Sequence, residues 1–168
     1  MDLTARIAMI LAAGAVVMDG QRTAVDNLWT LFWTLLHLLL FVLPAGPSAW
    51  RSAVFGAILP FLLLFPFFCF RMIGAGDIKL LMALGSMTGP TGCLTILLLT
   101  FLLAAIFAIS HFLRHHDLKE RMQYFADYVQ DYLQTGERRP YLRPGVQTEN
   151  LHMTIPIFFA TVLFFSFS

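Results

Sequence analysis

Charged residues are scarce in this sequence. Of its 168 residues, 11 are lysine or arginine and 10 are aspartate or glutamate, a charged content of 12%, whereas soluble domains average roughly 25%. The formal net charge is +1 and the chain has no basic stripe, which excludes an electrostatic nucleic-acid partner. Cysteine is scarce too: Cys69 and Cys93 form no CxxC pair and predict neither a zinc site nor a disulfide framework. We expect no metal and no other cofactor.

Long apolar runs take the place of charge. Hydrophobic residues make up 58% of the chain and the mean hydropathy is +0.74, and runs of this kind indicate membrane spans. We expect an all-α membrane protein with one domain over residues 1–168, a bundle of about six spans at residues 3–18, 28–43, 52–70, 73–90, 93–113 and 153–168. The first run is interpreted as a retained span rather than a cleaved signal peptide, because the rest of the chain is equally membrane-like.

A polar segment at residues 114–150 separates the last two spans. Its apolar residues recur at helical spacing before Gly136 and Pro140: Leu118, Met122, Phe125, Val129 and Leu133. This pattern predicts an amphipathic cytoplasmic helix followed by a loop. The apolar stripe could lie on the membrane surface or pack on the bundle, and packing on the bundle is the favoured interpretation.

The basic residues indicate an orientation. If Asp19 lies at the cytoplasmic end of the first span, only Arg6 and Arg51 fall outside, and the inside holds Arg22, Arg71, Lys79, Arg114, Lys119, Arg121, Arg138, Arg139 and Arg143. Positive residues concentrate on the cytoplasmic side of membrane proteins, although long loops count less. Without the 114–150 segment the tally falls to three against two, and the same orientation is still favoured.

Two aspartates stand out because acids at membrane depth are costly. Insertion scales put the cost at about 2.5–3.5 kcal/mol for Asp, so each such residue is a candidate functional group. The other acids lie at the N-terminus or in polar stretches, and Asp26 is expected to be solvated in a loop. Asp19 ends the first span and Asp77 opens the fourth, so the predicted topology places both at the same membrane face.

Two carboxylates in one low-dielectric site can act as an acid–base pair. They do not both ionise readily, so one holds a proton that the other lacks. The ionised group can take a proton from an attacking water, and the protonated group can give one to a carbonyl oxygen or leaving amine. Since the pair titrates as a unit, the roles of Asp19 and Asp77 stay open.

The residues around Asp77 read Gly74-Ala75-Gly76-Asp77, with Lys79 following. Glycines there allow the backbone to leave helical geometry and a substrate strand to approach closely. The alternative is glycine-mediated helix packing with Asp77 as an N-cap.

The stretch from Gly74 to Leu81 resembles the GxGD-x-K-L signature of type IV prepilin peptidases. A second motif agrees: Asp19-Gly20-Gln21-Arg22-Thr23-Ala24-Val25-Asp26-Asn27 resembles the family's first aspartate and the turn that follows it, with Arg22 and Asn27 at matching spacing. Ile155-Pro156 resembles the start of the family's last helix. The sequence departs from the pattern at Asp26, which replaces a proline, in having fewer arginines in the first turn, and in its polar 114–150 segment.

The resemblance implies an aspartyl endopeptidase in which Asp19 and Asp77 are catalytic, supported by Arg22, Asn27, Gly74, Gly76 and Lys79. It implies prepilin-like substrates with a basic leader and a hydrophobic N-terminal helix, cut near the cytoplasmic face of the inner membrane. The chain resembles short peptidase-only members without an N-terminal CxxC domain, such as those serving tight-adherence (Flp) pili.

Two other hypotheses are weighed. The presenilin-like branch of GxGD proteases shares the second motif, but Met18 precedes Asp19 where that branch has a tyrosine, and its Pro-Ala-Leu motif does not occur. A non-catalytic membrane component or a small proton- or cation-coupled transporter would use the acids for binding. An internal repeat would favour transport, and none is evident.

Overall fold

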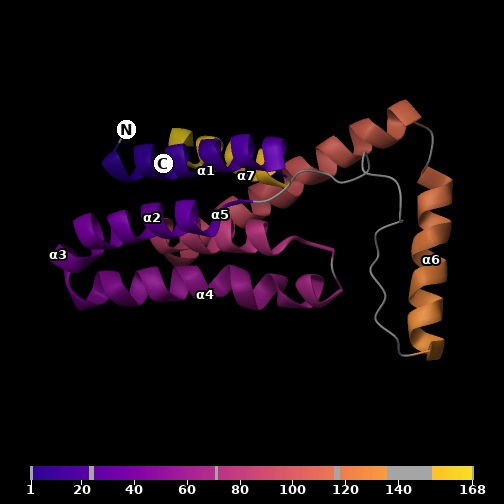
Figure 1. Cartoon of the computed structure of the whole chain (residues 1–168), viewed down its shortest axis with the longest axis horizontal. Helices are drawn as coiled ribbons and strands as arrows, with labels where there is room; N and C mark the ends of the chain where they lie inside the picture. The colour runs from indigo at the N-terminus through magenta and orange to yellow at the C-terminus, as the bar shows by residue number, and fades with distance from the viewer. Residues whose placement is uncertain (1, 23–24, 71, 116–117, 136–152, 168) are drawn as a thin grey trace.

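The computed structural model describes residues 2–22, 25–70, 72–115, 118–135 and 153–167, and within these ranges it contains helices and no strand. The elements are α1 (Leu3–Arg22), α2 (Asn27–His37), the π-helix η1 (Leu38–Val42), α3 (Leu43–Ala45), α4 (Pro47–Cys69), α5 (Ala75–His115), α6 (Leu118–Thr135) and α7 (Thr154–Phe167). The expected all-α class is therefore confirmed. In Figure 1, α1 and α7 lie together along one side of the bundle, α4 lies along the opposite side, and α2 and α5 lie between them.

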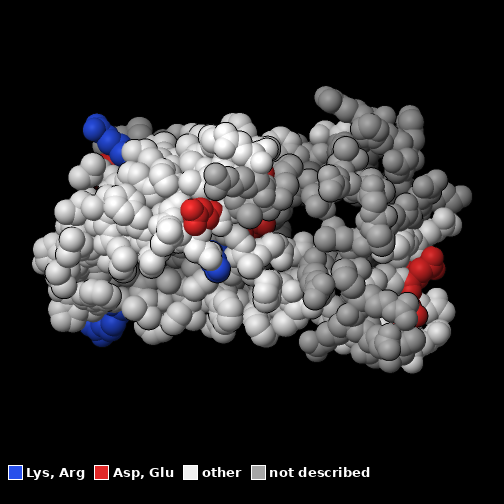
Figure 2. Space-filling view, viewed as in Figure 1, with Lys and Arg blue, Asp and Glu red and all other residues white. Residues whose placement is uncertain are grey.

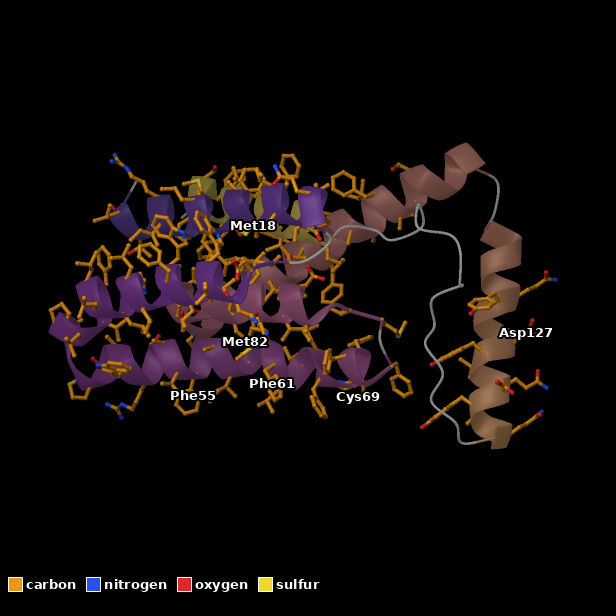
Figure 3. All side chains as sticks on the ribbon, in the orientation of Figure 1. Met18, Phe55, Phe61, Cys69, Met82 and Asp127 are labelled. Carbon is orange, nitrogen blue, oxygen red and sulfur yellow. The ribbon has the colours of Figure 1, made fainter. Side chains whose placement is uncertain are left out.

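The outer surface of the bundle is apolar. Among the residues that the structure describes, four segments are long and apolar enough to cross a membrane, namely Leu3–Gln21, Asn27–Ala45, Pro47–Cys69 and Ala75–Ser110, and α7 is a shorter apolar helix. Phe55 and Phe61 point outward from α4 (Figure 3), with 62% and 42% of their surfaces exposed. Charged side chains are sparse over the bundle in Figure 2. Such a surface suits lipid rather than water, as expected for a membrane protein.

Two helix ends differ from the apolar runs that predicted them. Helix α1 continues to Arg22 instead of ending at Met18, so Asp19 lies inside its last turn. Helix α4 begins at Pro47, five residues before the predicted run at 52, directly after Gly46, whose φ is 88°. Proline suits the first position of a helix and glycine suits a positive φ, so these two residues set the start of α4 before its apolar run begins.

Helix α5 reverses direction at Gly89. This residue has φ 72° and ψ 179°, which are not helical values. Across eight residues of continuous helix, Gly85 and Cys93 would be about 12 Å apart, yet a Cβ on Gly85 would lie 2.9 Å from the Cys93 Sγ. The chain therefore folds back into two arms, residues 75–88 and 90–115, which can be followed in Figure 1.

The core lies where α1, both arms of α5 and α7 meet. Its largest fully buried apolar side chains include Leu11, Leu80, Leu84, Ile96 and Ile157. Helix α4 packs against the first arm of α5 through two glycines: a Cβ on Gly56 would overlap the carbonyl oxygen of Gly85, and the reverse also holds. This close approach fixes the first arm, which carries Asp77.

Helix α6 stands across the end of the bundle and does not run alongside the other long helices (Figure 1). It contacts the end of α4 through Tyr132, whose ring meets Phe70 edge to face at 5.6 Å. Val129 and Leu133 are 37% and 77% exposed. At these two positions the structure does not show the favoured packing of the apolar stripe on the bundle, and the side chains of the other stripe residues, Leu118, Met122 and Phe125, lie outside its described part.

Candidate active site

The ends of α1 and α4 and the starts of α2, α5 and α7 lie toward the same end of the bundle (Figure 1). Asp19 is half-buried in the last turn of α1. The hydroxyl of Thr154, the first residue of α7, donates a 2.8 Å hydrogen bond to Asp19 Oδ2. Residues 135 positions apart are thus joined at this end.

The start of α2 is held against α1 by Trp29. Its indole Nε1 donates to the Leu11 carbonyl oxygen at 3.1 Å. The ring lies over Gly14, where even a Cβ would overlap it, so this approach requires glycine. Asp26 caps the helix, since its carboxylate accepts a 3.0 Å hydrogen bond from the Leu28 N–H. Asp26 is exposed as expected, and its cap sets the position of Asn27.

Asp77 lies in the first turn of α5, half-buried. The Gly74 carbonyl accepts from the Ile78 N–H at 3.4 Å, so the helix starts around Gly74 and Asp77 is inside it rather than at the N-cap position. A Cβ on Gly74 would lie 3.1 Å from Asp77 Oδ2, tighter than most such contacts. Glycine at 74 therefore leaves room for the carboxylate, and the helix N-terminus is a favourable place for its negative charge.

Two contacts join the region around Asp77 to the turn after Asp19. The Lys79 ammonium donates a 2.8 Å hydrogen bond to Asn27 Oδ1 across 52 residues of sequence. A Cβ on Gly76 would lie 3.5 Å from the Val25 Cβ, in ordinary van der Waals contact. The segments carrying the two predicted motifs are therefore in contact at one end of the bundle.

Four of the five predicted supporting residues lie at the site end of the bundle. Asn27, Gly74, Gly76 and Lys79 all lie at this end and make the contacts given above. Arg22 is the last residue of α1, and its side chain lies outside the described part of the structure. Sequence reasoning missed Thr154. The predicted span at residues 153–168 included this residue, but nothing in the sequence indicated a hydrogen bond to Asp19.

The chemistry available here consists of two carboxylates, a hydroxyl, an amide and an ammonium group. Among the residues the structure describes, no group of three or more His, Cys, Asp or Glu side chains could hold a metal ion. Carboxylates at the ends of two packed spans are groups that can take and give protons near a membrane surface.

No curated protein and no solved structure matches the chain. A family model described as "Type IV leader peptidase family" matches residues 6–109, more than half of the 168 residues. The matched range contains Asp19, Asn27 and the Gly74 to Lys79 stretch, and ends before α7. The chain therefore belongs to the type IV leader peptidase family, a family of aspartic-type peptidases.

Proposed function

We propose that this protein is a membrane aspartyl endopeptidase that removes the short basic leader from prepilin-like precursors of the tight-adherence (Flp) type. Asp19 and Asp77 are its catalytic pair. The observation that carries the proposal is the hydrogen bond between Lys79 and Asn27. It joins the start of α5, which carries Asp77, to the start of α2, which follows Asp19 by eight residues, and it supports the assignment of both aspartates to one site.

In the proposed mechanism, the ionised carboxylate removes a proton from a water molecule as that water attacks the scissile carbonyl carbon. The protonated carboxylate hydrogen-bonds to the carbonyl oxygen and then gives its proton to the leaving amine as the C–N bond breaks. One carboxylate has gained a proton and the other has lost one, so a proton exchange restores the pair. Positioned acid–base groups of this kind typically contribute about 10²–10⁴-fold in rate.

The proposed topology has six crossings: α1, the α2–η1–α3 segment, α4, the two arms of α5, and α7. A precursor whose apolar helix lies in the same bilayer can present the bond beside that helix to the end of the bundle where α1 ends and α5 and α7 begin.

The proposed orientation places the site at the cytoplasmic face of the inner membrane. Arg6 and Arg51 lie near the starts of α1 and α4, at the opposite end of the bundle from Lys79. Together with the basic residues of the 114–150 segment, this arrangement favours a cytoplasmic site end. A basic leader in the cytoplasm would then reach the aspartates directly.

The test is cleavage of a synthetic precursor by the purified protein in lipid nanodiscs. The substrate carries a basic leader followed by an apolar helix. Asp19→Asn and Asp77→Asn should each lower kcat by about 10²-fold or more, because asparagine neither gives nor takes the required proton.

Asp26→Asn is the matched control. It makes the same substitution within the first motif, at an exposed residue whose task is to cap α2, and asparagine caps helices as well as aspartate does. This variant should cut at the wild-type rate. Wild-type cleavage by the Asp19 or Asp77 variant would refute the proposed catalytic pair, and no cleavage by the wild-type protein would refute the proposed substrate class.

A further inference from the structure

We infer that Thr154 is a positioning residue for Asp19, so that the last helix contributes to the site although it lies beyond the range matched by the family model. This inference rests on the proposed function, in which Asp19 is catalytic. The observation behind it is the 2.8 Å hydrogen bond from the Thr154 hydroxyl to Asp19 Oδ2. Thr154 is only 1% exposed, so water does not compete readily for this hydroxyl.

The hydroxyl of Thr154 donates to a different kind of acceptor from the hydroxyls of six other threonines. Six others donate to a backbone carbonyl three or four residues earlier: Thr30, Thr34, Thr88, Thr95, Thr100 and Thr161. That local bond is the usual outcome for threonine inside a helix. As the first residue of α7, Thr154 has no preceding turn of that helix, and its hydroxyl reaches across to α1 instead.

The donor is rigidly held. Threonine is branched at Cβ, which restricts its rotation about χ1. The first turn of α7 is closed by a 3.1 Å hydrogen bond from the Ile157 N–H to the Met153 carbonyl oxygen, and both Pro156 and Ile157 are fully buried. A fixed hydroxyl on a packed helix can therefore fix the rotation of the Asp19 carboxylate, which sits in the last turn of another helix.

Fixing the carboxylate matters for the rate of the chemical step. Proton transfer needs heavy atoms within about 2.6–3.2 Å of each other, and small misplacements of a catalytic group lower kcat strongly. Thr154 is itself buried and acts on the reaction only as a hydrogen-bond donor to the Asp19 carboxylate. Its loss should therefore reduce kcat and leave KM within about twofold of the wild-type value.

The experiment compares Thr154→Ser with Thr154→Ala in the full-length protein, using the nanodisc cleavage assay. The two variants differ only in the hydroxyl group, so packing losses from the missing methyl are common to both. Serine should keep kcat within about threefold of wild type, and alanine should lower it on the order of 10- to 100-fold, as expected for a lost hydrogen bond to a charged group.

Thr161→Ala is the matched control within the same helix. Thr161 is also fully buried, but its hydroxyl donates to the Ile157 carbonyl oxygen in its own helix. Its kcat should stay close to the wild-type value. Equal kcat for the serine and alanine variants at position 154, or an equal loss from Thr161→Ala, would overturn the positioning role.

The proposed function and this inference fail in different ways. If Asp19→Asn abolishes cleavage while Thr154→Ala leaves it intact, the inference alone is wrong. If Asp19→Asn cuts normally, the catalytic pair itself is wrong and the inference falls with it.

Discussion

The crossing of α4 and the first arm of α5 gives a prediction that the structure makes quantitative. A Cβ added to Gly56 would overlap the Gly85 carbonyl oxygen, and it would lie 2.8 Å from the Gly85 carbonyl carbon and 2.9 Å from that of Gly89. All three atoms belong to the backbone, so no side chain can rotate away. Gly56→Ala can be accommodated only if the two helices separate.

The expected loss of stability follows from two opposing effects. Overpacking a well-packed interior costs typically 1–3 kcal/mol, and a backbone neighbour points to the upper part of that range. Alanine recovers roughly 1 kcal/mol through its better helix propensity. We therefore expect Gly56→Ala to lower the free energy of unfolding by about 1–2 kcal/mol. Separation of α4 from α5 would also shift the arm that carries Asp77, so kcat should fall in the protein that remains folded.

Gly20→Ala provides the control, because Gly20 is also helical but a Cβ there would have nothing within 4 Å. This variant should be as stable as the wild type, or more stable by up to about 1 kcal/mol. Both free energies can be measured by denaturant titration in mixed micelles, followed by tryptophan fluorescence. Equal stability of the Gly56 and Gly20 variants would refute the close crossing of the two helices.

Two further predictions concern contacts that hold the site end and the far end of the bundle. The hydrogen bond between Lys79 and Asn27 should appear as non-additivity in a double-mutant cycle of Lys79→Met and Asn27→Ala, measured on kcat/KM. Because both residues are exposed, we expect a coupling free energy of about 0.5–1 kcal/mol. Full additivity would contradict the contact. Gly89→Ala should destabilise the protein by more than Gly46→Ala: both have positive φ, but a Cβ on Gly89 would also lie 2.6 Å from the Ser52 hydroxyl, whereas one on Gly46 meets open space. Thermal unfolding of both variants measures the difference, and equal midpoints would contradict the close approach of Ser52 to Gly89.

Much of the fold could be predicted because a membrane restricts the choices. Backbone groups in lipid must be satisfied within the segment, so apolar runs of this length become helices. The apolar runs did not predict helix ends, because a helix continues as long as its backbone hydrogen bonds continue, including into polar residues. That is why α1 runs on past Met18 to include Asp19, and why α4 starts at Pro47.

The candidate site was predictable where it depends on local motifs and not where it depends on packing. Asp77 and the glycines Gly74 and Gly76 are neighbours in the sequence, so the backbone freedom around Asp77 could be predicted from this stretch alone. The hydrogen bond from Thr154 to Asp19 joins residues 135 positions apart and exists only because α7 packs beside α1. Helix α6 shows the same limit: its periodicity predicted a helix, but not the ring contact between Tyr132 and Phe70.

The reversal at Gly89 is what allows these distant residues to meet. Asp19 lies in the last turn of α1, at the site end of the bundle. The chain must then run along the bundle an even number of times before a later residue is back at that end. In the proposed topology, the α2–η1–α3 segment and α4 make two crossings and return the chain to Asp77, and the two arms of α5 make two more before Thr154. Without the reversal, residues 75–110 would form one helix of about 54 Å, far longer than the roughly 30 Å hydrocarbon core. Helix α7 would then start at the opposite end, where its threonine could not reach Asp19. A single positive-φ glycine, 12 residues beyond Asp77 and remote from any proposed chemistry, therefore determines whether the last helix can take part in the site.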